Sequence, residues 1–239
     1  MSSRKKGRRL TRAERRRRVI RNRIIFGCCC LVVLIAIIVG ISLTVKSCRH
    51  KKSEAKLTYK TSQIHVKKDK SLMLAYVEDF SKDYYEEAEL KKNVENEIAS
   101  FNSNSKSGKM EISQFTVENG KAYLYLKAES LDTYKEYFEN YMYQGQELKM
   151  KIGTMGELEE EGAMTLDHYK NVKNGKAVDK IDLSDQKSLM VIYTTHGDEF
   201  SVDGDILYVS DKVEMDGNVA KAAEGEDNFI IYQENNEES

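Results

Sequence analysis

The chain carries four histidines that are candidates for acid–base catalysis or metal binding: His50, His65, His168 and His196. No two of them have the HxxxH or HExxH spacing that places two imidazoles on one face of a helix, so a helical zinc site is disfavoured. Carboxylates neighbour two of them, in Asp167-His168 and in His196-Gly197-Asp198. Such pairs can do acid–base chemistry, but neighbours in sequence seldom face one site. We therefore expect no catalytic residue, no metal-binding residue and no cofactor.

Acidic side chains crowd the segment from 198 to 211, at Asp198, Glu199, Asp203, Asp205 and Asp211. They lack the ligand register of the twelve-residue calcium loop, so a solvated acidic surface is the favoured interpretation and weak divalent-ion contact is the alternative. The sequence also contains no GxSxG serine elbow and no GxxxxGK[ST] phosphate loop. These observations favour a protein without catalytic activity.

Tyrosines gather in the first half of the outer part, at Tyr84, Tyr85, Tyr123, Tyr125, Tyr134, Tyr137, Tyr141 and Tyr143. Aromatic rings at helical or strand spacing usually fill a core and its rim, which is the favoured interpretation. A contact surface for a glycan or a protein is the alternative.

An apolar segment near the N-terminus has the strongest signal in the sequence. From Ile24 to Val45, 22 consecutive residues carry no charge, and most are Ile, Leu, Val or Cys. At about 1.5 Å per residue this segment makes a helix of about 33 Å, long enough to cross a hydrocarbon core of about 30 Å. A secretory signal has a shorter apolar core of about 7 to 15 residues. We expect residues 24 to 45 to span the lipid bilayer.

The charges around this segment predict its orientation and the partners of each side. Residues 1 to 23 contain twelve Lys and Arg side chains and one acid, so the positive-inside rule places them in the cytoplasm. This basic tail is expected to attract anionic lipid headgroups. Residues 47 to 239 carry 25 of the 38 basic side chains but 38 of the 39 acidic ones, a net charge of −13. Such a surface repels nucleic acid, which we do not expect as a partner.

Cysteine is confined to the anchor region. Cysteines 28 to 30 lie in the apolar segment, Cys48 follows it, and residues 49 to 239 contain none, so the outer part has no disulfide or metal-thiolate chemistry. The sequence ending at Cys48 bears a loose likeness to a bacterial lipobox, which makes Cys48 a candidate lipidation site. The charged Lys46 and the long apolar segment favour an uncleaved anchor over a lipoprotein.

The pattern of residues 63 to 153 predicts an α+β domain in the order strand, helix, strand, strand, helix, strand. Hairpin turns are expected at Lys68-Asp69-Lys70 and at Asn119-Gly120, because Asn-Gly tolerates two positive φ values. One helix is expected after Asp83 and another after Ser130, with residues 148 to 152 as the closing strand. This order allows a split βαβ sandwich with both helices on one sheet face.

Further along the chain, short apolar runs separated by Gly, Asp or Asn predict a β-rich part. The expected strands are 177–181, 188–194, 200–202, 206–209, 213–215 and 229–232. The expected organisation is a basic cytoplasmic tail (1–23), a transmembrane helix (24–45), a polar linker (46–62), an α+β domain (63–153), a β-rich domain (154–233) and an acidic tail (234–239).

Five segments carry a resemblance to known proteins: VEDFSKDYY (77–85), LKKNVENEIASFN (90–102), FTVENGKAYLYL (115–126), GDILYVSDKVEM (204–215) and NFIIYQ (228–233). They resemble an uncharacterised, membrane-anchored group of cell-surface lipoproteins of Gram-positive anaerobic bacteria. The resemblance covers most of residues 64 to 232 and implies a surface location and a two-part αβ ectodomain. The arginine-rich tail and the long apolar segment depart from that group.

Three classes of function remain open. The favoured one is a single-pass plasma-membrane protein whose outer part is a non-catalytic binding or assembly module for an envelope protein or polysaccharide. The second is a cell-envelope enzyme with a site built from scattered carboxylates. The third is a bitopic scaffold of a division or secretion complex, in which the span and basic tail select the partners.

Overall fold

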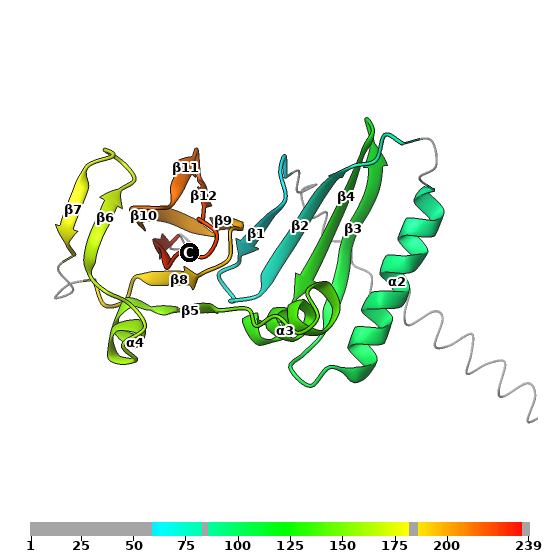
Figure 1. Cartoon of the computed structure of the whole chain (residues 1–239), viewed down its shortest axis with the longest axis horizontal. Helices are drawn as coiled ribbons and strands as arrows, with labels where there is room; N and C mark the ends of the chain where they lie inside the picture. Colours follow the sequence, from blue (N-terminus) through cyan, green and yellow to red (C-terminus); the bar gives the residue numbers. More distant parts are fainter. Residues whose placement is uncertain (1–58, 83–85, 182–185, 236–239) are drawn as a thin grey trace, which may run out of the picture. The chain divides into compact units, whose positions relative to one another are not determined.

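The computed structural model of the chain describes residues 59–82, 86–181 and 186–235 (Figure 1). Within these ranges no helix is both long and apolar enough to cross a membrane. The expected basic tail, transmembrane segment and lipidation site, at residues 1 to 23, 24 to 45 and Cys48, lie outside the described residues. The described residues form mostly strands and few helices, which confirms the α+β class.

Seven strands form the first sheet, in the order β11-β12-β9-β1-β2-β4-β3. The strand bounds are β1 Gln63–Val66, β2 Leu72–Asp79, β3 Met110–Glu118, β4 Lys121–Ala128, β9 Glu199–Val202, β11 Glu214–Asp216 and β12 Val219–Lys221. All neighbours pair antiparallel except β1 and β9, which are parallel. Because β4 lies between β2 and β3, the segment from β2 to β3 is a split β-α-β arrangement.

Two tight turns form where the sequence predicts them. Lys70 has a φ of 62° in the turn between β1 and β2. Asn119 and Gly120 have φ values of 54° and 72° between β3 and β4. Two successive positive φ values are typical of a type I′ turn, whose twist matches that of the paired strands. Both predicted hairpins are confirmed.

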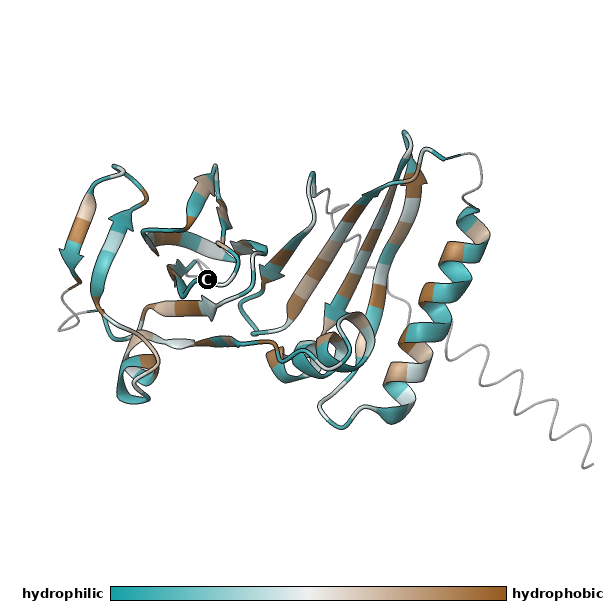
Figure 2. Cartoon of the chain, viewed as in Figure 1, coloured by the Kyte–Doolittle hydropathy of each residue, from teal (hydrophilic) through white to brown (hydrophobic). Residues whose placement is uncertain are grey.

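The first helix, α2 (Glu87–Asn104), packs beside β3 (Figure 1). It buries Ile98 and Phe101, which lie three residues apart and so on one side of the helix. Figure 2 shows apolar residues on a mostly hydrophilic helix. The helix ends within the Asn102 to Gly108 stretch, as the cluster of Asn, Ser and Gly predicts.

The second helix, α3 (Leu131–Tyr137), begins after Ser130, whose hydroxyl accepts a hydrogen bond from Thr133 N–H over 3.1 Å. It continues into a π-helical turn, η1 (Phe138–Met142), where Tyr143 N–H donates to Phe138 O, five residues back. Side chains of α2, α3, β2 and β4 belong to one buried cluster. Both helices therefore cover the same face of the first sheet, as the sequence predicts.

Six strands form the second sheet, in the order β5-β8-β13-β10-β6-β7. The bounds are β5 Met150–Thr154, β6 Asp167–Asn171, β7 Ala177–Lys180, β8 Met190–Thr194, β10 Gly204–Ser210 and β13 Asn228–Glu234. All neighbours pair antiparallel. A short helix, α4 (Met155–Glu160), follows β5 and packs against β5 and β8.

The strands do not separate into sheets at the expected division between residues 153 and 154. The strand expected at 148–152 exists as β5, but it pairs with β8 in the second sheet instead of closing the first. In turn, β9, β11 and β12 extend the first sheet through β1. The largest buried cluster accordingly contains side chains of both sheets, such as Leu74 and Phe200 with Ile192 and Ile230.

Candidate functional site

A row of side chains crosses the outer face of the second sheet and forms the floor of a cavity. Lys151 of β5 pairs with Tyr193 of β8, and Tyr193 pairs with Phe229 of β13. The N–H of Phe229 donates to Ser210 Oγ of β10 over 3.0 Å. Ser210 pairs with Tyr169 of β6. Paired residues on adjacent strands point to the same face, so five strands place these five residues side by side.

Aromatic rings make up most of this floor. The ring centroids of Tyr193 and Phe229 lie 5.2 Å apart, and those of Tyr169 and Phe229 lie 6.3 Å apart. Tyr169 and Phe229 are buried, whereas Tyr193 is half-buried. Ser210 stands between Phe229 and Tyr169 in the row and also lines the cavity. The resulting cavity has a volume of about 650 Å³.

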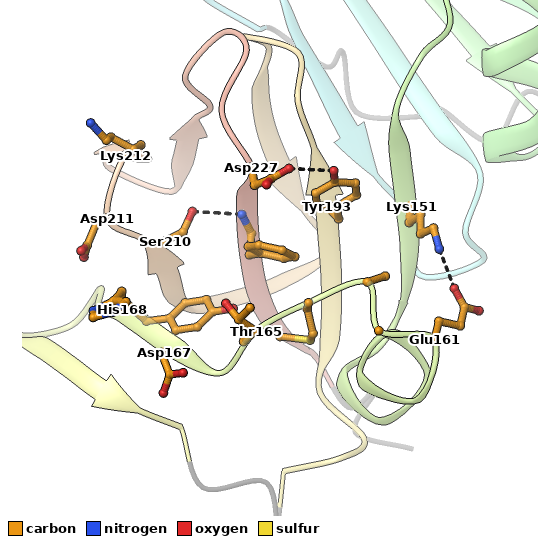
Figure 3. Close-up of a pocket in the computed structure, with 15 residues that line it drawn as sticks. Lys151, Glu161, Thr165, Asp167, His168, Tyr193, Ser210, Asp211, Lys212 and Asp227 are labelled. Atoms are coloured by element: carbon orange, nitrogen blue, oxygen red, sulfur yellow. Dashed lines mark hydrogen bonds and ion pairs between the residues drawn. The ribbon is translucent and has the colours of Figure 1, made fainter.

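Charged side chains stand around the floor (Figure 3). The cavity is lined by two lysines and four acids: Lys151, Lys212, Glu161, Asp167, Asp211 and Asp227. His168, with a φ of 68°, also lines it. The rim therefore has a net negative charge and presents many hydrogen-bond acceptors. An apolar floor with a few polar groups around it is the usual construction of a small-ligand site.

The wall beside α4 is held by local hydrogen bonds. The Thr154 hydroxyl accepts from Glu157 N–H over 3.2 Å, and the Glu157 carboxylate accepts from Thr154 N–H over 2.7 Å, which is a capping box. These bonds hold the pKa of Glu157 below its usual value. At the other end of the helix, Lys151 Nζ lies 2.7 Å from Glu161 Oε2. Residues 161 to 165 are thereby positioned over the sheet.

The phenol groups of the floor are bonded to the walls. Tyr193 donates to Asp227 Oδ1 over 2.8 Å, and Tyr169 donates to Thr165 O over 2.5 Å. Burial, followed by the hydrogen bond to Asp227, raises the pKa of Tyr193 to about 12. Burial also raises the pKa of Tyr169. Both phenols are therefore neutral at physiological pH, and the cavity has no phenolate nucleophile.

The three described histidines have separate surroundings in the structure. His50 lies outside the described residues, and within those residues His168 has no carboxylate partner despite its neighbour Asp167. His196 Nδ1 lies 2.9 Å from Asp198 Oδ2, so this sequence neighbour does face its histidine. His65 Nδ1 lies 2.9 Å from Ser201 Oγ, and its Nε2 lies 2.9 Å from Asp203 Oδ1.

The acidic residues from 198 to 211 are dispersed over several contacts. Asp198 contacts His196, Asp203 contacts His65, and Glu199 accepts from Thr61 Oγ1 over 2.6 Å. Among the described residues, no three His, Cys, Asp or Glu side chains are grouped to hold a metal ion.

The tyrosines that the sequence singles out pack as expected where the structure describes them. Tyr125, Tyr134 and Tyr137 are buried and Tyr143 is exposed, in line with core and rim packing.

Sequence reasoning missed the row of Lys151, Tyr193, Phe229, Ser210 and Tyr169 completely. These residues come from five strands and share no motif, and only strand pairing brings them together. The alternation of side chains in MVIYT and NFIIY indicates which residues share a face of each strand. It does not indicate which strands are neighbours.

No protein-family model, no curated protein and no solved structure matches this chain.

Proposed function

We propose that the chain is a single-pass plasma-membrane protein whose C-terminal part is a non-catalytic binding module outside the cytoplasm. In this proposal residues 24 to 45 form the transmembrane helix, and the basic tail contacts anionic headgroups on the cytoplasmic side. The split βαβ-like unit and the β-rich part that follow both lie outside. The uncharged run of 22 residues and its basic flank support the anchor and its direction.

The aromatic floor of the cavity on the second sheet is the observation that carries the binding function. Pyranose rings have an apolar face of C–H groups that packs on aromatic rings, and hydroxyl groups that donate to carboxylates. The cavity combines both features, with Tyr193 and Phe229 below and Asp227 and Asp167 at the rim. An uncharged polysaccharide of the cell envelope is therefore the proposed ligand.

Binding of envelope polysaccharide to the full chain in lipid nanodiscs tests this function. Tyr193→Ala removes the most accessible ring of the floor and is expected to weaken binding at least about tenfold, or about 1.4 kcal/mol. Tyr193→Phe keeps the ring and loses only the bond to Asp227, so its effect is expected to be smaller. Tyr123→Ala, a partly buried tyrosine of β4, is the matched control. Equal binding by the wild type and Tyr193→Ala would exclude this cavity.

The proposed orientation has its own test. Protease added to intact cells should remove the chain beyond about residue 50 and spare the basic tail, since only the outer part is accessible. A fully protected C-terminal part would contradict the proposed topology.

The mass of the mature N-terminus distinguishes the two anchors. An uncleaved chain keeps residues 1 to 47, whereas a lipoprotein begins at a diacylated Cys48. Detection of the diacylated form would replace the transmembrane helix with a lipid anchor, while the outer location would stand.

The carboxylates around the cavity also favour the envelope-enzyme hypothesis, as a second candidate. Glycosidases use two carboxyl groups on opposite sides of the scissile bond, and the rim provides four acids. Asp167→Asn and Asp227→Asn should abolish cleavage of a bound polysaccharide if this hypothesis holds. If the wild type binds the polysaccharide without cleaving it, the result supports the non-catalytic binding module.

The scaffold alternative predicts that exchange of residues 24 to 45 for an unrelated span displaces the protein from its complex.

A further inference from the structure

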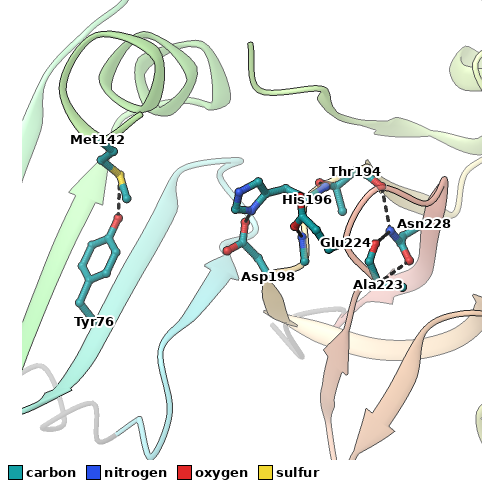
Figure 4. A network of polar contacts seen from close by, with 9 residues as sticks. Tyr76, Met142, Thr194, His196, Asp198, Ala223, Glu224 and Asn228 are labelled. Carbon is teal, nitrogen blue, oxygen red and sulfur yellow. Dashed lines mark hydrogen bonds and ion pairs between the residues drawn. The ribbon is translucent and has the colours of Figure 1, made fainter. Parts of the chain in front are cut away.

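A second, smaller cavity of about 180 Å³ lies between β1, β2, the α3–η1 segment and the loop after β8. His196 and Asp198 both line it. Among the described histidines, only His196 contacts the carboxylate that is its neighbour in sequence. Figure 4 shows this pair, with Tyr76 and Met142 on neighbouring elements. The cavity shares no lining residue with the aromatic floor of the larger one.

The Asp198 carboxylate has an unused oxygen. Its Oδ2 lies 2.9 Å from His196 Nδ1, and Oδ1 has no hydrogen-bond partner among the described residues. The Asp198 side chain is 29% exposed and lines the cavity. The His196 ring packs against two aromatic rings, with centroids 5.2 Å from Phe138 and 5.8 Å from Tyr143. Asp198 is thus held in place with one anionic acceptor available to a ligand.

Two phenols line the cavity close to this carboxylate. Tyr134 is 3% exposed, and its hydroxyl has no hydrogen-bond partner among the described residues. The Tyr76 hydroxyl donates to Met142 Sδ over 3.2 Å, which is a weak acceptor, and its own oxygen can still accept. Nearby charge on Asp198 contributes to the raised pKa of both phenols, after burial. Gln63 also lines the cavity, and its Oε1 is buried with no hydrogen-bond partner among the described residues. A buried acceptor without a partner is costly, so a ligand with donors would be stabilised here.

The charges of the lining select the class of ligand. The described residues of the lining include two acids, Asp198 and Glu78, and no lysine or arginine. An anion would be repelled, and a divalent metal ion would find only one fixed carboxylate where it needs several oxygen ligands. An ammonium group has three donors and no acceptor, which suits a carboxylate oxygen and two phenol oxygens. The faces of Phe138 and Tyr143 can cover its alkyl chain and attract its charge.

The volume limits the size of the ligand. A cavity of about 150 Å³ accommodates benzene, so about 180 Å³ holds a group of roughly six heavy atoms. We propose that this cavity binds a primary alkylammonium group with a short aliphatic chain, with Asp198 as the charged acceptor and Tyr134 and Tyr76 as neutral acceptors. A free amine and a lysine side chain of a peptide present the same chemistry. This proposal is independent of the polysaccharide function.

Calorimetric titration of the full chain in nanodiscs with n-butylammonium tests the proposal, with 1-butanol as the uncharged ligand of similar size. Saturable binding of butylammonium is expected, and 1-butanol should bind at least about tenfold more weakly because it has no charge for Asp198. Asp198→Asn keeps an acceptor for His196 and should lose at least about tenfold in butylammonium affinity. Asp216→Asn, on exposed β11, makes the same charge change elsewhere and should leave affinity unchanged.

A second variant keeps the test valid if Asp198→Asn does not fold. Tyr134→Phe removes only the unpartnered hydroxyl and should weaken butylammonium binding severalfold, with Tyr123→Phe as its control. Equal affinity for butylammonium and 1-butanol, or full affinity in both Asp198→Asn and Tyr134→Phe, would overturn the proposal. A peptide with one free lysine, compared with its N-acetylated form, distinguishes the sources. Binding of that peptide indicates a peptide partner, and binding of butylammonium alone indicates a free amine.

Discussion

The side-chain amide of Asn228 donates a hydrogen bond to the main-chain oxygen of Thr194 over 3.2 Å and ties the start of β13 to the end of β8 (Figure 4). The same amide donates to Ala223 O and Glu226 O, each over 2.8 Å. Its oxygen accepts from Ala223 N–H over 2.9 Å. Asn228 is fully buried, so these bonds have no competition from water.

The first prediction concerns this amide. Asn228→Ala leaves several buried polar groups unpaired and should lower the free energy of unfolding by about 3 kcal/mol. Asn228→Asp keeps the size but replaces the donor with an acceptor that faces three carbonyl oxygens. It should therefore lower the free energy of unfolding by a larger amount than Asn228→Ala at pH 7. Urea unfolding of the two variants measures this order. If Asn228→Asp were as stable as the wild type, the amide network would not stabilise the fold.

Local features of the fold followed from the sequence because they depend on neighbouring residues. Asn119-Gly120 predicts its hairpin through two positive φ values, and Ser130 predicts the start of α3 through its side-chain acceptor. The Thr154–Glu157 capping box was equally readable, but α4 was missed because six residues are too few for a helical period to show. The strands β6 and β12 were missed for different reasons: DHYKN is largely polar, and VAK has only three residues.

Sheet membership did not follow from the sequence, because it depends on contacts between residues far apart. β1 pairs in parallel with β9, so Ile64 faces Phe200 across more than a hundred residues of chain. No local pattern encodes that pairing. Both cavities depend on such pairings, so their residues were not predictable as groups. His196 and Asp198 were recognised only because they are also close in sequence.

The second prediction concerns Glu136, which binds the loop after α2. Its Oε2 accepts from Ser105 Oγ over 2.9 Å, from Ser107 N–H over 3.0 Å and from Ser107 Oγ. The hydrogen bond of the Ser107 side chain is the main cause that lowers the pKa of Glu136 below its ordinary value of 4.5. Glu136→Gln should reduce the free energy of unfolding by about 1 kcal/mol at pH 7, a modest amount because the group is partly solvated.

The pH dependence of this effect has a definite sign. A carboxylate with a lowered pKa stabilises the folded state above its unfolded pKa of 4.5, and this contribution is lost as pH falls through the lower folded pKa. The difference in the free energy of unfolding between wild type and Glu136→Gln should therefore shrink as pH falls from 4.5 through the lower folded pKa. Glu95→Gln, on the exposed side of α2, is the control and should show little difference at any pH. If the difference in the free energy of unfolding between wild type and Glu136→Gln did not change with pH, the stabilising role of the Glu136 carboxylate would be contradicted.

The third prediction concerns Gly204, the first residue of β10. A Cβ at this position would lie 2.2 Å from Gln233 O on the paired strand β13, so the two strands would have to separate. Gly204→Ala should destabilise the protein by about 2 to 3 kcal/mol. Gly156→Ala in α4 is the matched comparison, because the atoms nearest to a Cβ there belong to Lys187 and lie at 3.5 Å or more. That change should stabilise by about 0.5 to 1 kcal/mol, since alanine favours a helix over glycine. If thermal unfolding showed Gly204→Ala to be as stable as Gly156→Ala, the close approach of Gly204 to Gln233 O would be refuted.

The fourth prediction links Asp198 to pH and to the proposed amine. Burial raises the pKa of Asp198 above its ordinary value of 3.8, and the charge of Glu224 raises it further, while His196 lowers it. An acid with a raised folded pKa is fully stabilising only below its unfolded pKa, and this stability is lost as pH rises through the folded pKa. At pH 7 the folded state therefore carries a carboxylate that is poorly solvated.

Asp198→Asn has no charge to desolvate, so its Tm should exceed that of the wild type by a few degrees at pH 7 and should equal it near pH 3.5. Glu78 and Glu224 are present in both proteins, so comparison of the two proteins at each pH removes their contribution. Addition of n-butylammonium should raise the wild-type Tm at pH 7, because the ammonium group compensates the Asp198 charge and binds only the folded state. The same addition should have no effect near pH 3.5, where Asp198 is protonated, or on Asp198→Asn at either pH. A Tm increase of equal size in all four cases would show that the amine acts elsewhere on the protein.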